Sequence, residues 1–154
     1  MKIKIGINGM GRIGRMILRS IFEGNKDIEI KHINNRTNSE TCSTLLKYDS
    51  IHGKFKADIS YDEKNLIVNK NKISFGQETD LNKIDWKKYG VDYVFECTGK
   101  FNSKDKLGPH LNNGAKKVIV SAPCKNADKT IVFGVNESES VSYTHLRAHE
   151  TLTD

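Results

Sequence analysis

Residues 5–15 read IGINGMGRIGR, and the glycines at positions 9, 11 and 14 follow the spacing G-x-G-x-x-G. Before them, residues 2–8 alternate and are rich in isoleucine, which is the pattern of a β-strand. The strand pattern runs directly into the glycine cluster, and such clusters mark turns. This stretch therefore predicts a strand that ends in a tight glycine turn.

The residues after the turn complete a larger unit. From Gly11 onward, apolar residues recur three or four positions apart, which predicts one buried face of a helix that ends near Gly24. A second isoleucine-rich strand is expected at 28–33. A strand, a turn, a helix and a strand within about 30 residues form one βαβ unit.

The remaining segments extend this unit into a sheet. Asn38 or Ser39 is expected to cap a helix that buries Cys42, Leu45 and Leu46. Short alternating runs predict small antiparallel strands beside the main sheet, at 56–61, 66–69 and 73–75. A buried strand, a helix and a further strand are predicted at 91–96, 103–112 and 116–120. Alternating strands and helices indicate an α/β protein of the Rossmann type, doubly wound, with a mostly parallel sheet and a small antiparallel insertion.

The glycine spacing carries a functional prediction. In a Rossmann unit the first glycine makes the turn, the second admits a pyrophosphate, and the third lets helix and strand pack closely. Asn35 lies 21 positions after the last glycine, where a carboxylate would bind the ribose hydroxyls and repel a 2′-phosphate. Asn35 is neutral and Arg36 follows it, so a phosphorylated ribose is less strongly excluded. The expected cofactor is NAD, with NADP possible. Whether Arg36 attracts a 2′-phosphate or is an ordinary surface arginine stays open.

Composition and charge narrow the possible partners. The 154 residues are 36% hydrophobic and 29% charged, and the net charge is +6. The lysines are spread along the chain rather than gathered in one run, so a nucleic-acid partner is not favoured. We expect no signal peptide, no membrane span and a cytoplasmic protein. The three cysteines lack C-x-x-C spacing, which predicts neither a disulfide framework nor a metal site.

Five segments together resemble one enzyme family. They are residues 5–15, 47–55 (KYDSIHGKF), 96–101 (ECTGKF), 114–123 (GAKKVIVSAP) and 129–136 (KTIVFGVN). In this order and spacing the chain resembles the phosphorylating glyceraldehyde-3-phosphate dehydrogenases. The resemblance covers residues 1 to about 139, so we expect a dinucleotide-binding domain at 1–139 and a non-native or disordered tail at 140–154. The catalytic domain of the family is expected to be absent.

The resemblance implies roles for particular residues. Arg12 and Ile13 would present their backbone to the pyrophosphate, and Asn35 would occupy the ribose-contacting position. Thr98, Gly99 and Ser121 would line the path toward the nicotinamide, although both segments could also be ordinary strand-end turns. Near Trp86 the family has a basic residue on the adenine side, and the matching position is Thr79. The cofactor-binding residues expected are Asn8, Gly9, Gly11, Arg12, Ile13, Gly14, Asn35, Thr79, Thr98, Gly99 and Ser121.

The resemblance also implies a reaction that this stretch of chain does not complete. The family oxidises glyceraldehyde 3-phosphate with phosphate and NAD(P) to 1,3-bisphosphoglycerate, in glycolysis, through a cysteine thioester. The nucleophile's Ser-Cys-Thr-Thr-Asn-like segment does not occur here. Cys42, Cys97 and Cys124 are expected to be structural, so no catalytic residue is expected and the chain alone is expected to be inactive.

Other interpretations stay open at this stage. Erythrose-4-phosphate dehydrogenase shares the architecture, and a non-catalytic dinucleotide- or RNA-binding module would share the basic charge. The family forms homotetramers, which is the partner expectation for the full-length enzyme. His145 and His149 are four apart and could form half of a metal site, but no third ligand motif accompanies them.

Overall fold

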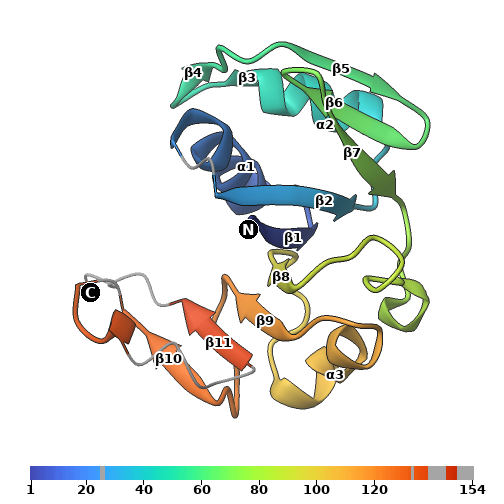
Figure 1. Cartoon of the computed structure of the whole chain (residues 1–154). Coiled ribbons are helices and arrows are strands. Elements are labelled where there is room, and N and C mark those ends of the chain that lie inside the picture. The colour runs from blue at the N-terminus through green and yellow to red at the C-terminus, as the bar shows by residue number, and fades with distance from the viewer. Residues whose placement is uncertain (25–26, 133, 139–144, 149–154) are drawn as a thin grey trace.

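The computed structural model describes residues 1–24, 27–132, 134–138 and the backbone of 145–148. Its main feature is a nine-stranded sheet in the order β10-β11-β9-β8-β1-β2-β7-β6-β5 (Figure 1). Seven neighbouring strands run parallel: β10 (Lys129–Ile131), β11 (His145–Ala148), β9 (Lys117–Val120), β8 (Tyr93–Glu96), β1 (Ile3–Asn8), β2 (Ile28–Asn34) and β7 (Asn71–Gly76). β6 (Asn65–Val68) and β5 (Ile59–Asp62) add an antiparallel edge, which confirms the predicted fold class.

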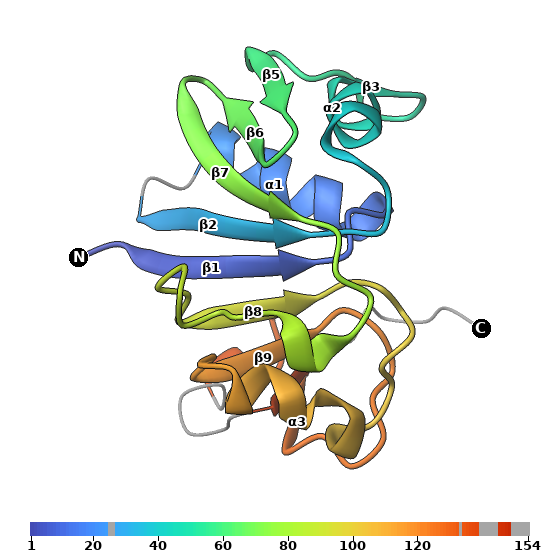
Figure 2. The ribbon, with the colours of Figure 1, turned by 90° about the vertical axis from the view of Figure 1, so that its right-hand side faces the viewer.

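The chain order turns around at β1. The first crossover, through α1 (Arg12–Gly24), leads from β1 to β2 on one side, and the later strands β8 and β9 are added on the other side. Figures 1 and 2 together show α1 and α3 (Lys104–Asn112) on opposite faces of the sheet. Ligands of open α/β sheets bind where the strand order reverses, at the carboxyl ends of the strands. The topology therefore points to the carboxyl end of β1.

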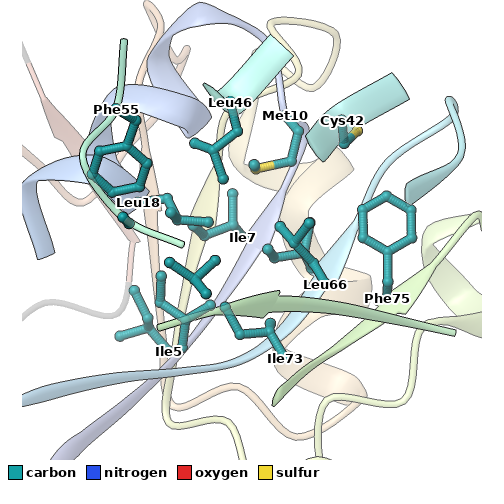
Figure 3. Close-up of a cluster of buried hydrophobic side chains, with 14 residues drawn as sticks. Ile5, Ile7, Met10, Leu18, Cys42, Leu46, Phe55, Leu66, Ile73 and Phe75 are labelled. Atoms are coloured by element: carbon teal, nitrogen blue, oxygen red, sulfur yellow. The ribbon is translucent and has the colours of Figure 1, made fainter. Parts of the chain in front are cut away.

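The larger part of the core lies between α1, α2 (Ser39–Lys47) and the sheet. Buried apolar residues of β1, β2, β6 and β7 pack with Leu18 of α1 and Leu46 of α2, which are both fully buried. Figure 3 shows part of this cluster. A second cluster forms around Trp86, behind the short η1 (Leu81–Lys83), and a third lies between α3 and β9. None of the helices among the described residues is both long and apolar enough to cross a membrane.

Two expectations from the sequence need correction. Leu45 was expected in the core but is 43% exposed. Cys42 and Leu46 lie one helical turn apart and share the buried face, whereas the side chain of Leu45 is rotated by about 100° from its neighbour. The segment 73–75 was expected in an antiparallel insertion, but β7 pairs in parallel with β2 and therefore belongs to the main sheet.

Some elements were not anticipated. The hairpin of β3 (Tyr48–Asp49) and β4 (Gly53–Lys54) and the strand β10 were not predicted. Four residues of the expected tail, His145–Ala148, form β11 between β9 and β10, and the expectation of a non-native or disordered tail at 140–154 stays a prediction. The rest of 140–154, including His149, lies outside the described residues.

Candidate dinucleotide-binding site

A pocket opens at the carboxyl ends of the central strands, where the topology predicts a ligand. Its volume is about 320 Å³, which suits a small-molecule ligand or part of a larger one. The glycine turn after β1 forms one side, and the ends of β2 and β8 and the segment after β7 form the others. The lining residues are Asn8, Gly9, Gly11, Asn34, Asn35, Arg36, Glu78, Thr79, Leu81, Cys97, Thr98, Lys100 and Phe101.

The three glycines of the turn have different physical roles. Gly9 has a φ of +98°, which L side chains rarely adopt. A Cβ atom on Gly14 would lie 2.1 Å from the carbonyl oxygen of Gly9, so only glycine lets α1 approach the turn this closely. A Cβ on Gly11 would meet no heavy atom within 4 Å. The space over Gly11 and the first amides of α1 is therefore free for an anion, which the helix N-terminus favours.

Asn35 closes the pocket beside the turn. Its Oδ1 accepts a hydrogen bond from the backbone N–H of Met10 at 3.0 Å, which ties the end of β2 to the glycine turn. Its Nδ2 donates to Thr37 Oγ1 at 2.6 Å and to Cys42 Sγ at 3.1 Å. An aspartate here would place a negative charge in the pocket; Asn35 does not, and the exposed Arg36 adds a positive one. The electrostatic barrier to a 2′-phosphate is therefore missing.

The last residues of three adjacent strands form a buried polar row. Asn34, Asn8 and Glu96 end β2, β1 and β8, and the register places Asn8 beside each of the other two. Asn34 Nδ2 donates to Asn8 Oδ1 at 2.8 Å, and Asn8 Nδ2 donates to Glu96 Oε2 at 2.6 Å. All three side chains are at least 97% buried, since their exposed fractions are 3%, 2% and 1%. The row forms the floor beneath the pocket.

Thr98 and its neighbours are held by the same row. The backbone N–H and the hydroxyl of Thr98 donate to Glu96 Oε1 at 3.0 and 2.5 Å. Ser121, at the end of β9, donates its backbone N–H to the Glu96 carbonyl oxygen at 3.1 Å. Gly99 is exposed and has a φ of +71°. These hydrogen bonds stabilise the turns after β8 and β9, as the alternative interpretation of ordinary strand-end turns also expects.

The predicted site residues divide into two groups. Those that line the pocket are Asn8, Gly9, Gly11, Asn35, Thr79 and Thr98. Those that lie beside it without lining it are Arg12, Ile13, Gly14, Gly99 and Ser121. Arg12 and Ile13 are exposed at the start of α1, and Gly14 serves helix packing. Direct contact of any of these residues with a dinucleotide stays a prediction.

Sequence reasoning missed several lining residues. They are Asn34, Glu78, Leu81, Cys97, Lys100 and Phe101. One signal was available, because β1, β2 and β8 each end in a polar residue that directly follows an apolar one, and neighbouring parallel strands bring such residues together. The positions of Glu78 and Leu81 follow from the path of the chain after β7, for which the sequence carried no pattern.

The cysteines of the chain have the surroundings of structural residues. Cys42 and Cys124 are 1% and 7% exposed, and all three cysteines are free thiols. Burial, with a smaller contribution from the Glu96 carboxylate, raises the pKa of the Cys97 thiol to about 12. Cys97 lines the pocket but is therefore protonated and a poor nucleophile at neutral pH. Among the described residues no group of three or more His, Cys, Asp or Glu side chains could hold a metal ion.

Comparison with known proteins gives the family. Residues 3–104 match the family described as glyceraldehyde 3-phosphate dehydrogenase, NAD binding domain. The chain belongs to this family. The matched span contains the glycine turn, Asn35, the segment after β7 and Thr98, so it covers all sides of the pocket. NAD is therefore the cofactor of this domain, and the family is one of NAD-dependent oxidoreductases.

Individual relatives agree with the family match. The chain is 47% identical over 139 residues to the glyceraldehyde-3-phosphate dehydrogenase of Geobacillus stearothermophilus, which covers 90% of this chain and 41% of that protein. The enzyme of the same name from Thermotoga maritima is 47% identical over 137 residues, covering 88% of this chain and 41% of the relative. The chromosomal enzyme of Cupriavidus necator is 48% identical over 139 residues, covering 88% and 41%. The chain thus spans about two fifths of the length of these relatives.

Proposed function

We propose that this chain supplies the dinucleotide-binding part of a phosphorylating glyceraldehyde-3-phosphate dehydrogenase. The full-length enzyme would oxidise glyceraldehyde 3-phosphate with phosphate and NAD(P) to 1,3-bisphosphoglycerate and would work in glycolysis as a homotetramer. The observation that carries the proposal is the pocket at the strand-order reversal, with the glycine turn on one side and Asn35 on another. A cytoplasmic location belongs to the same proposal, and the three free cysteines support it, since reducing compartments keep thiols unpaired.

The proposal assigns each part of the dinucleotide to a part of the pocket. The pyrophosphate lies over Gly11 at the start of α1, where backbone amides and the helix dipole favour negative charge. The adenosine ribose lies against Asn35, and the adenine extends toward Thr79. The nicotinamide half lies along the end of β8, beside Thr98 and Gly99, with Ser121 at the end of the next strand.

We further propose that the 154 residues alone do not turn over the aldehyde. The reaction of the family needs a cysteine thiolate that can reach a substrate. Cys42 and Cys124 are buried, and the pKa of the Cys97 thiol is about 12, so none of the three offers an accessible thiolate at neutral pH. The purified chain is expected to bind NAD and to show no aldehyde-dependent formation of NADH.

The experiment that tests the site is a titration of the purified chain with NAD, followed by calorimetry and by the melting temperature. A ligand at a hundred times its Kd stabilises the folded state by about 2.7 kcal/mol, which raises Tm by several degrees in a chain of this size. A folded chain whose Tm does not move and which releases no heat with NAD would contradict the proposed site.

A pair of matched variants shows where the cofactor binds. Gly11→Asp places a carboxylate in open space where the pyrophosphate is expected, so repulsion should weaken NAD about hundredfold while the fold persists. Gly108→Asp makes the same change at an equally open position in α3, away from the pocket, and should leave the affinity unchanged. Equal affinities of the two variants for NAD would contradict the proposed position of the pyrophosphate at Gly11.

A further inference from the structure

Beneath the pocket, the buried row at the strand ends continues to both sides as one hydrogen-bonded chain. On one side, His110 Nε2 lies 2.8 Å from Glu96 Oε2, and Trp86 Nε1 donates to His110 Nδ1 at 2.9 Å. Trp86, His110 and Glu96 are at most 1% exposed. On the other side, Asn34 Oδ1 accepts from the backbone N–H of Glu78 at 2.8 Å, and Asn34 Nδ2 donates to the Glu78 carbonyl at 2.9 Å.

The donors and acceptors in this chain leave no freedom of direction. An indole N–H can only donate, so His110 Nδ1 accepts and the ring proton lies on Nε2, which donates to Glu96. Glu96 therefore receives four donors: His110, the Asn8 amide, and the N–H and hydroxyl of Thr98. An acceptor of four hydrogen bonds and donor of none is an ionised carboxylate.

The charge of Glu96 fixes the orientation of each amide that follows. Asn8 turns its NH₂ to Glu96 and hence its oxygen to Asn34. Asn34 then turns its NH₂ to Asn8 and its oxygen to the Glu78 N–H. The backbone N–H of Glu78 can only donate and its carbonyl can only accept. The indole of Trp86 at one end and the backbone of Glu78 at the other therefore require the same orientation of every hydrogen bond between them. Glu78 and Thr79 form the wall of the pocket that follows β7.

We propose that Glu96 is a positioning residue for the dinucleotide. It holds Thr98 on one wall of the pocket through two hydrogen bonds, and through Asn8 and Asn34 it holds the Glu78–Thr79 wall. Glu96 does not itself line the pocket, and the amide and hydroxyl of Thr98 are committed to it. The distance between the two walls of the cofactor pocket is therefore determined by buried side chains, although Glu96 itself makes no contact with the cofactor. This inference rests on the dinucleotide site proposed above.

Glu96→Gln tests the proposal with almost no change of shape. The new amide presents an NH₂ to donors, and reversing Asn8 and Asn34 to relieve the conflict would break both hydrogen bonds to Glu78. We expect the Kd for NAD to rise about tenfold in protein that is still folded, and the Glu78 amide to exchange its hydrogen faster. Trp86 is the only tryptophan of the chain, so its fluorescence reports whether the variant is folded.

A matched control separates positioning from general destabilisation. Val68→Ala removes buried volume from β6, far from the row, and should lower Tm while leaving the Kd for NAD and the Glu78 exchange unchanged. A Glu96→Gln variant that binds NAD with the wild-type Kd would overturn the positioning role. A folded wild-type chain that binds no NAD would instead overturn the proposed site, and the positioning role with it.

A second pair of variants decides the question if Glu96→Gln does not fold. His110 touches Glu96 but does not line the pocket. His110→Gln keeps a side-chain N–H that can donate to Glu96, whereas His110→Leu has a similar size and no donor. The proposal expects weaker NAD binding in His110→Leu and a Kd closer to the wild-type value in His110→Gln. Equal, wild-type affinities in both variants would overturn it.

Discussion

The glycine turn at one side of the pocket and the strand-end row beneath it are built in opposite ways. The glycine turn is made of backbone from a few consecutive residues, and the space over Gly11 is open. The strand-end row is made of buried side chains, Asn34, Asn8 and Glu96, from positions far apart in the sequence. An open backbone surface can accept an anion without rearrangement, whereas a fully bonded row can keep the opposite walls at a fixed spacing. The turn therefore supplies an open surface, while the row, in which Asn8 and Asn34 also line the pocket, supplies its support.

The largest effect is expected where the glycine turn is tightly packed. Gly14→Ala would put a Cβ atom 2.1 Å from the Gly9 carbonyl oxygen, and backbone has to move to make room. We expect the free energy of unfolding, measured by urea denaturation, to fall by about 3 kcal/mol. Gly11→Ala, with no heavy atom near the new Cβ, should change it by no more than about 0.5 kcal/mol. Similar losses in both variants would remove the distinction between the packed and the open part of the turn.

A second effect tests the packing around Trp86, at one end of the hydrogen-bonded row, because the ring of His32 lies edge-on to Trp86 with 5.6 Å between the centroids. His32 is 3% exposed and stacks on Tyr89, with ring centroids 3.9 Å apart. Burial, with a smaller effect of the Lys88 charge, lowers the pKa of His32 from 6.5 to about 4. As pH falls, the histidine of the unfolded chain is protonated before that of the folded chain. The contribution of His32 to the free energy of unfolding is therefore fully present above pH 6.5 and is lost between pH 6.5 and about 4.

The decline attributable to His32 is up to about 3 kcal/mol. Urea denaturation at a series of pH values measures it, and His32→Phe, which keeps an aromatic ring for Tyr89, serves as the comparison. Carboxylates affect both proteins in the same way. The difference between the two slopes of unfolding free energy against pH, over pH 4 to 6.5, therefore gives the contribution of the histidine alone. Identical slopes would mean that the ring is hydrated in the folded state.

The contrast between the turn and the row also explains how much the sequence could predict. The glycine turn is contiguous, so its spacing predicted β1, α1, β2 and the lining residues Gly9, Gly11 and Asn35, whereas Thr79 and Thr98 were expected only from the family resemblance. Glu96 joins the row only because β8 lies beside β1, and His110 reaches Glu96 from α3; no local pattern of the sequence records either arrangement. The exposure of Leu45 likewise depended on how α2 is rotated against the sheet, which two neighbouring leucines do not determine.

A smaller effect concerns the choice between NAD and NADP. Asn35→Asp would restore a negative charge at the ribose position, which accepts hydrogen bonds from the hydroxyls and repels a 2′-phosphate. We expect the ratio of the Kd for NADP to the Kd for NAD to rise about tenfold, or about 1.4 kcal/mol. Asn38→Asp adds the same charge three residues away and keeps an oxygen for the cap of α2, so it controls for the change in net charge. An unchanged ratio in Asn35→Asp would place the ribose elsewhere.

The smallest effect is expected at Cys97. Cys97 lines the pocket, yet the pKa of its thiol is about 12, so at pH 8 about one molecule in ten thousand carries the thiolate. Iodoacetamide should therefore leave Cys97 unmodified in the folded chain, as measured by mass spectrometry of peptides, while all three cysteines react in urea. Because the residue before Cys97 is Glu96, rapid modification of the folded protein would mean that the end of β8 opens readily. The row would then be too mobile to hold the walls of the pocket at a fixed spacing.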